Sequence, residues 1–313
     1  MKKIFIAITI LLVAYNANAC SICGCGGGNL YLGMYPNFDS KFLGVRYNYS
    51  SYKTVLQNDN TQFSNNTYNT YEIWTGYNLT KKWQIFGFIP YQSNNIVSDD
   101  GSSKTNGVGD ITLLTNYQLL NSRKVVNDKK LVIHQLWMGG GIKFNTGLFA
   151  VDPHDPDVTL ANVNAQMGTG STDFILNARD IYQVENWGLA TNLNYKMNTQ
   201  NKDDYQFGNK FTMNSILYYN INNKHTVFTP NAGVQFENNE GNKLDGHLIS
   251  LTEGIDNGNY RTGGHSVNIL GGVEMNVNKI TVGVNVQLPI QQNYAEGQTN
   301  LNWKGTAHIS FSF

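Results

Sequence analysis

The last thirteen residues of this chain, 301–313, alternate strictly between apolar or small side chains and polar ones. Successive side chains of a β-strand point to opposite faces, so one face of this segment would carry Leu, Trp, Ile and Phe and the other Asn, Lys, Thr, His and Ser. One face suits hydrocarbon and the other suits water. The pattern therefore predicts a strand that crosses a membrane and ends on the aromatic Phe313.

The beginning of the chain predicts export. Lys2 and Lys3 precede the apolar run 4–14, and small residues at 17–19 offer a cleavage site, so we expect a signal peptide over 1–19. No later segment approaches the roughly 18 apolar residues that a membrane-spanning helix needs. An exported chain that crosses a bilayer with strands must close them into a barrel, because hydrocarbon offers no partner to an open edge. The expected location is the outer membrane of a Gram-negative cell.

Charge excludes one class of partner. The chain has 22 basic and 22 acidic residues and a formal charge of zero, which leaves no electrostatic footprint for nucleic acid. The 18 Tyr and 5 Trp are typical of aromatic girdles at the two interfaces of a bilayer.

The spacing of strand signals predicts an all-β fold, a transmembrane antiparallel up-and-down barrel of about twelve strands with periplasmic N- and C-termini. Short turns around 80–81, 121–128, 185, 222–223 and 278 interleave with longer loops at 54–67, 95–106, 146–169, 200–205, 240–261 and 294–300, which is the order expected for such a barrel. The predicted strands are 41–53, 68–79, 82–94, 107–121, 129–145, 170–183, 186–199, 206–221, 224–239, 262–277, 279–293 and 301–313.

Alternation also predicts which polar side chains face the inside of the barrel. These residues carry both signs of charge, which is consistent with a mixed-charge, water-filled passage or a binding cavity. The alternative is a small barrel filled by side chains whose charges pair with one another. The predicted lumen-lining residues are Arg46, Glu72, Asp110, Glu274, Gln287, Lys304 and His308.

All three cysteines lie in a Cys- and Gly-rich segment, 20–40, which we expect at the periplasmic mouth or as a plug before the barrel domain 41–313. Cys20, Cys23 and Cys25 are spaced so that their thiolates could converge on Cu(I) or Zn(II). Copper or zinc is therefore the candidate cofactor. Two alternatives remain open: a disulfide, which an oxidising envelope favours, and lipidation of Cys20.

Other motifs predict less. The loop 152–157 gathers three carboxylates and an imidazole, which would suit a divalent cation or simply a solvated loop. Gly139-Gly140-Gly141 falls inside a predicted strand, where a bulge, a bend or a close backbone approach explains it. No Ser/His/Asp order, carboxylate pair or nucleotide fingerprint stands out, so we do not predict an enzyme.

The segment Asn106-Gly107-Val108-Gly109-Asp110-Ile111 resembles the Gly-x-Gly-Asp element of outer-membrane barrels grouped as phenol-degradation meta-pathway or transporter proteins. The Cys-x-x-Cys-Gly-Cys start, followed by 42–47, resembles envelope barrels that share this opening. The resemblance implies a barrel over nearly all of the mature chain, and Gly107, Gly109 and Asp110 are the residues that match the element. It does not extend to phenol metabolism.

These observations predict an outer-membrane channel or transporter for a small solute or ion, with a thiolate metal site near its N-terminus. The alternative is a metal-binding receptor or envelope sensor that the barrel only anchors. The expected partners are outer-membrane lipid, the solute or ion, and the barrel-assembly machinery, which would recognise the strand ending at Phe313.

Overall fold

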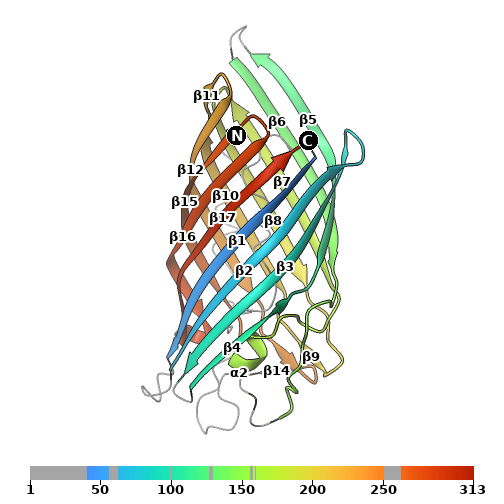
Figure 1. Cartoon of the computed structure of the whole chain (residues 1–313), viewed down its shortest axis with the longest axis vertical. Helices are drawn as coiled ribbons and strands as arrows, with labels where there is room; N and C mark the ends of the chain where they lie inside the picture. Colours follow the sequence, from blue (N-terminus) through green and yellow to red (C-terminus); the bar gives the residue numbers. More distant parts are fainter. Residues whose placement is uncertain are drawn as a thin grey trace, which may run out of the picture.

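Twelve long strands form a closed barrel in the computed structural model, which describes residues 41–55, 63–98, 101–126, 130–155, 158, 160–249 and 262–313 (Figure 1). Each wall strand pairs antiparallel with the next, β17 pairs with β1, and β10 pairs with both β8 and β12, which closes the wall. The wall strands are β1 (Phe42–Val55), β2 (Phe63–Asn78), β3 (Trp83–Ser98), β5 (Thr112–Val126), β6 (Lys130–Lys143), β7 (Asp173–Val184), β8 (Trp187–Met197), β10 (Lys210–Tyr219), β12 (Thr226–Asn239), β15 (Gly264–Val277), β16 (Ile280–Tyr294) and β17 (Thr299–Ser312).

The two ends of the barrel differ in the length of their connections, as the sequence predicts. Short turns and the C-terminus lie at the upper end of Figure 1, where the β5–β6 hairpin projects beyond the other strands. One of these turns places Asn278 at a φ of 53°, a left-handed conformation that Asn tolerates better than most residues. The short strand β11 (Ile221–Asn223) also lies at this end, which we assign to the periplasm because short turns are typical of that side.

Long connections gather at the opposite, outer end of the barrel (Figure 1). They contain the helix α2 (Leu160–Asn164), the 3-10 turn η1 (Ala295–Gly297), and a small sheet of β9 (Tyr205–Gln206), β13 (Lys243–Leu244) and β14 (His247–Leu248). Phe149, Val163 and Phe207 belong to an apolar cluster that joins these connections. Among the described residues, no helix is both long and apolar enough to cross a bilayer.

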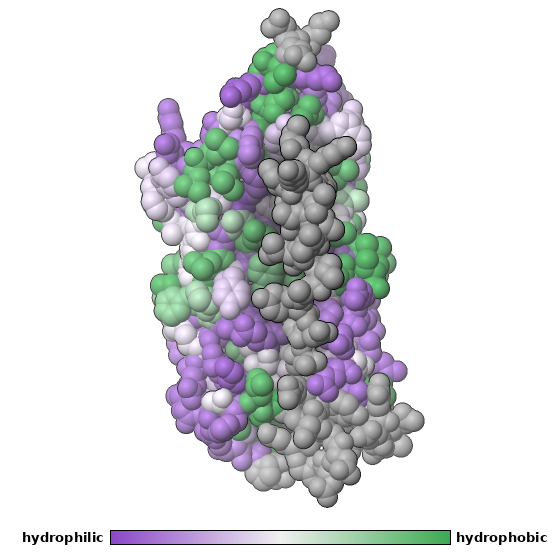
Figure 2. All heavy atoms as spheres, turned by 180° about the vertical axis from the view of Figure 1, so that it is seen from behind, coloured by the Kyte–Doolittle hydropathy of each residue, from purple (hydrophilic) through white to green (hydrophobic). Residues whose placement is uncertain are grey.

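Burial alternates along the wall strands. In β16 the outward side chains of Val284 and Val286 are about half exposed, whereas the intervening Asn285 is 4% exposed. Figure 2 shows apolar side chains over the middle and upper parts of one face of the barrel and mostly hydrophilic ones over its lower part. The wall therefore has an apolar outside and a polar inside, which is the arrangement that hydrocarbon on one side and water on the other demand.

Aromatic residues on the outside of the wall lie near both ends of the strands. Near the short turns, Trp83 packs on Tyr117 with ring centroids 5.0 Å apart, and Trp187 packs on Tyr219 at 4.8 Å. Farther toward the outer end, Tyr49 packs on the ring of Trp303 at 4.4 Å. Amphipathic rings at two levels are typical of the two interfaces of a bilayer.

The predicted connections are wrong in part, most clearly at 95–106. Residues 95–106 were expected to form a polar loop, but β3 continues to Ser98 and pairs with β4 (Gly101–Val108) in a hairpin. The predicted strand 107–121 is divided between β4 and β5, and the interruption contains Gly109 and Asp110. Hydrogen bonds of the ladder explain the difference, because they stabilise strands whose side chains are polar on both faces and which give no alternation signal.

The triple glycine of β6 allows two strands to approach closely. A Cβ atom at Gly139 would lie 2.0 Å from the backbone oxygen of Thr115, and one at Gly141 would lie 2.3 Å from the side chain of Leu114. The absence of side chains makes room for inward residues of the neighbouring β5, as expected from a close backbone approach. The bulge in this strand pair lies elsewhere, between Gln118 and Leu120.

Candidate functional site

The structure buries every residue predicted to line the lumen. Arg46, Glu72, Asp110, Glu274, Gln287, Lys304 and His308 are each 7% exposed or less. They come from five wall strands and from the interruption after β4, and they do not converge on a single point. Three groups can be distinguished: a pair at mid-wall, a lysine cluster in the outer third and an ion-pair network beneath the outer connections.

The mid-wall group centres on Arg46, which pairs with Glu72 on the neighbouring strand. The guanidinium group of Arg46 also lies 5.3 Å from the ring centroid of Trp74, and the ring of His308 contacts the same indole edge-on at 5.8 Å. On the far side of His308, a Cβ atom at Gly283 would lie within 2.9 Å of both the imidazole and the Glu274 side chain. The missing side chain at Gly283 thus leaves room for both side chains on the inner face.

The lysine cluster lies in the outer third of the wall. The ammonium group of Lys304 on β17 lies 2.9 Å from one carboxylate oxygen of Glu237 on β12, and that of Lys210 on β10 lies 3.1 Å from the other. The hydroxyl of Tyr294 donates to Glu237 and also lies 2.8 Å from the hydroxyl oxygen of Ser266. Since β15 and β16 lie between β12 and β17, the Lys304–Glu237 pair spans the inner face of two strands.

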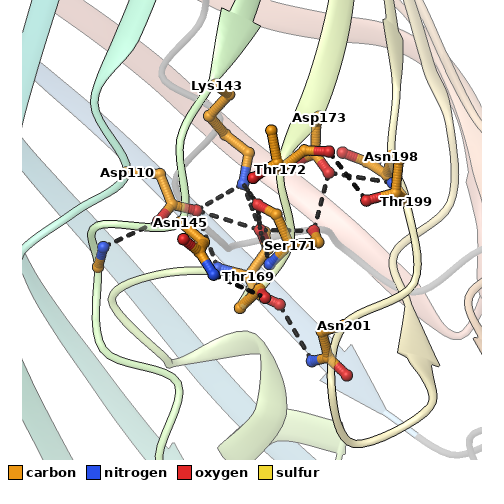
Figure 3. Close-up of polar contacts among 12 residues, drawn as sticks. Asp110, Lys143, Asn145, Thr169, Ser171, Thr172, Asp173, Asn198, Thr199 and Asn201 are labelled. Atoms are coloured by element: carbon orange, nitrogen blue, oxygen red, sulfur yellow. Dashed lines mark hydrogen bonds and ion pairs between the residues drawn. The ribbon is translucent and has the colours of Figure 1, made fainter.

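A buried network lies where β4 gives way to β5 (Figure 3). Lys143 at the end of β6 forms ion pairs with Asp110 and Asp173, the second at 2.9 Å, and all three side chains are at most 1% exposed. Asp110 accepts hydrogen bonds from the backbone N–H groups of Gly147 and Thr169, each at 2.9 Å. These contacts satisfy the buried carboxylate, which is costly to bury without such partners.

The network fastens the connection 144–172 against the inner wall. The side chains of Asn94 and Thr105 donate to the backbone oxygen of Ala165 at 3.2 and 2.7 Å. Met167 lies over the glycines of the Gly-x-Gly-Asp element, because a Cβ atom at Gly107 would be 3.1 Å from its Cγ and one at Gly109 would be 3.2 Å from its backbone oxygen. The element is therefore the place where this connection docks onto the wall.

Many inward amides have polar atoms that no protein group satisfies. Within the part of the chain that the structure describes, the side-chain oxygen atoms of Asn192, Asn194 and Gln287, and both polar atoms of Asn231, are buried and accept or donate no hydrogen bond to protein. The Nε2 atom of His308 is likewise buried and has no hydrogen-bond partner in the protein. A buried polar atom without a partner costs free energy, so these atoms require water or a solute.

A cavity of about 350 Å³ opens near the short-turn end of the barrel. Amide side chains dominate its lining, with Arg123 and Glu274 as its charged members. The amides are Gln135, Gln183, Asn220, Asn222, Asn276 and Asn278. The cavity can hold a small polar solute or a group of water molecules.

The predicted metal site lies outside the described residues, because Cys20, Cys23 and Cys25 precede residue 41. Among the described residues, no group of three or more His, Cys, Asp or Glu side chains is arranged to hold a metal ion. In the acidic outer loop, His154 instead contacts Asp152 at 3.3 Å and Asp245 at 3.2 Å. A hydrogen bond from the backbone of His154 lowers the pKa of Asp152.

Several charged residues of the interior were not among the sequence predictions: Lys143, Asp173, Arg179, Lys196, Lys210 and Glu237. Alternation could have found Glu237, because Phe228, Val234 and Phe236 mark the outward face of its strand. Lys143 and Asp173 end their strands at a long connection, where no pattern indicates which partner they meet.

A closed barrel with an apolar outside, aromatic residues at two levels and a polar, charged inside defines an outer-membrane β-barrel protein. The structure is similar to the outer membrane channel from Pseudomonas putida F1, with 13% identity and a TM-score of 0.54 over 88% of this chain and 96% of that one. It is also similar to the beta domain of the Bordetella autotransporter BrkA, with 11% identity and a TM-score of 0.50 over 88% of this chain and all of that domain. These likenesses show the fold and confirm the outer-membrane barrel.

No protein-family model and no curated protein matches the chain. The resemblance to the phenol-degradation or transporter group therefore stays a prediction, although the barrel fold that it implies is confirmed.

Proposed function

We propose that this protein is an outer-membrane channel through which small solutes or ions diffuse, and that Arg46, Glu72, Glu274, Gln287, Lys304 and His308 line its path. The observation that carries the proposal is the set of inward amide atoms without protein partners, for example those of Asn192 and Asn231. A barrel filled by its own side chains would satisfy these atoms or replace them with apolar groups. Their presence supports a hydrated interior.

Two further observations support a channel. The amide-lined cavity near the short turns provides a polar entrance at one end of the barrel. In addition, the Pseudomonas putida F1 protein that shares the fold is itself an outer membrane channel. The amides and the charged groups of both signs along the wall would offer a polar solute successive hydrogen-bond partners as it passes.

Swelling of liposomes that contain the purified protein tests the proposal. We expect swelling in solutions of small neutral solutes such as glycine or arabinose, at rates that fall as the solute becomes larger. The matched control is the same protein after heat denaturation, which should give the rate of empty liposomes. Equal rates for folded protein and empty liposomes would contradict a channel.

The cysteine triplet supports a second activity, capture of a soft metal ion. Cys20, Cys23 and Cys25 supply three thiol ligands within six residues, which suits Cu(I) or Zn(II). Intact mass spectrometry of the protein purified from outer membranes, with and without chelator, should show a metal adduct that disappears in the Cys23→Ser, Cys25→Ser variant. A disulfide or an acyl group on Cys20 would instead assign this segment a structural role.

A further inference from the structure

The inner wall of the barrel carries more positive than negative charge. Outside the ion-pair network of Lys143, five buried or nearly buried cationic side chains of the described wall strands face inward, against three carboxylates. The cations are Arg46, Arg179, Lys196, Lys210 and Lys304, and the carboxylates are Glu72, Glu237 and Glu274. Lys143, Asp110 and Asp173 do not enter this balance, because the two carboxylates bond to Lys143 and to the outer connections rather than facing the passage.

The excess is concentrated in the lysine cluster. Lys210 and Lys304 both bond to Glu237, so the two cations share a single carboxylate. Lys196 is the direct cross-strand partner of Lys210, and because residues paired in this way point to the same face, Lys196 adds a third ammonium group to the same patch of wall. Like charges directly opposite one another on neighbouring strands destabilise a sheet.

The cluster also lies where a passing solute would meet it. Lys304 reaches across the inner face of β15 and β16 to bond Glu237, so its side chain extends along the inner surface instead of lying flat on its own strand. Of the two lysines bonded to Glu237, Lys210 keeps more of its side chain accessible, 17% against 5%. Amide groups of Asn194 and Asn239 in the same strands have oxygen atoms without protein partners.

We propose that Lys196, Lys210 and Lys304 form an anion-selective step in the passage, so that the solutes it favours are small anions carrying a carboxylate, phosphate or similar group. The proposal rests on the channel function proposed above. An entering anion exchanges with the Glu237 carboxylate on the two ammonium groups, and Glu237 keeps the binding weak enough for release. Binding that is favourable yet reversible is what conduction through such a step requires.

Measurement of the reversal potential in planar bilayers, with a KCl gradient across the purified protein, tests this proposal. We expect chloride to be more permeant than potassium in the unaltered protein. K210Q should lower the chloride-to-potassium permeability ratio by roughly fivefold, the effect of one unit charge at about 4 Å in water. E237Q should raise the ratio, because it removes the negative charge that competes for the lysines. The control K82Q, in an exposed turn, should leave the ratio unchanged.

The outcomes separate this proposal from the channel itself. A current that favours potassium, or one whose ratio is the same in K210Q, E237Q and K82Q, would overturn the anion step while leaving the channel intact. Absence of any current from the folded protein would overturn both. Opposite shifts in K210Q and E237Q would support the proposal even if one of them folds less efficiently, since only inserted molecules contribute current.

Discussion

Asp110 and Lys143 form an ion pair across the interruption between β4 and β5, with both side chains at most 1% exposed. The pair joins the Gly-x-Gly-Asp element to the end of β6 and, through Thr169 and Gly147, to the connection that covers the outer part of the wall. A motif that the sequence singled out for its glycines thus has a mechanical role, which is to hold a long connection in place.

Replacement of Lys143 by Met should destabilise the barrel by about 3–5 kcal/mol, because it leaves Asp110 and Asp173 buried without their cation. Limited proteolysis should also cut the connection 144–172 faster. The free energy of unfolding, measured by denaturant titration in lipid vesicles, checks the first effect. Lys82→Met, in an exposed turn, should change it by no more than about 0.5 kcal/mol. Equal effects of the two variants would contradict a structural role for the network.

Replacement of Gly139 by Ala should cost about 1–3 kcal/mol, because its Cβ would overlap the backbone oxygen of Thr115 and push β5 and β6 apart. Gly271→Ala is the matched control, since the atom nearest to a Cβ at that position is 3.9 Å away. Thermal denaturation of the two variants checks the difference. A neutral Gly139→Ala variant would show that the two strands do not approach as closely as described.

A charge on the outside of the wall should be far more costly than one on the inside. Val284→Arg, on the exposed face of β16, should lower the free energy of unfolding in a bilayer by about 2–4 kcal/mol. Asn231→Arg, on the inner face of β12, should have a much smaller effect because the new guanidinium would meet water and amides. A larger loss of unfolding free energy for Asn231→Arg than for Val284→Arg would contradict the assignment of the lipid-facing and inner faces.

The contact of His154 with Asp245 should depend on pH. Partial desolvation, the largest influence, lowers the pKa of His154, but the hydrogen bonds and charges of Asp152 and Asp245 together outweigh it and raise the pKa above its usual value. The protonated ring is therefore the bonded form, so the contact between these two outer connections is strongest at low pH and is lost as the pH rises through that pKa.

Titration of the imidazole by NMR checks this contact. Asp245→Asn should bring the midpoint of His154 down, and His247→Gln, on the same small sheet, should leave it unchanged. An unchanged midpoint in Asp245→Asn would show that the two connections do not meet in solution.

Most of the wall strands can be predicted from the sequence, because alternation of apolar and polar residues is a local signal. In 282–286, three valines two residues apart predict the outward face, and the structure exposes Val284 and Val286 while burying Asn285. The same signal fails toward the outer end of β3, where Asn94, Asn95 and Ser98 place polar side chains on both faces, because strands that extend beyond the bilayer need no apolar face.

The interior contacts could be predicted only in part. Parity places Lys304 and His308 on the inner face, but it does not show that Lys304 reaches Glu237, two strands beyond its neighbour β16. The network of Asp110, Lys143 and Asp173 depends on how the connection 144–172 folds back, which is a tertiary property without sequence periodicity. The folding of the long connections is therefore the part of the structure that the sequence predicts least well.

Thiol labelling of a lumen position during current recording tests the central claim of a hydrated passage most directly. In a background with Cys20, Cys23 and Cys25 replaced by Ser, Asn231→Cys places a thiol on the inner face of β12 and Ala232→Cys places one on the outer face. A negatively charged methanethiosulfonate should change the current of Asn231→Cys in discrete steps and leave that of Ala232→Cys constant. Unmodified current in both variants, with the reagent shown to react with the unfolded protein, would mean that water and solutes do not reach the interior.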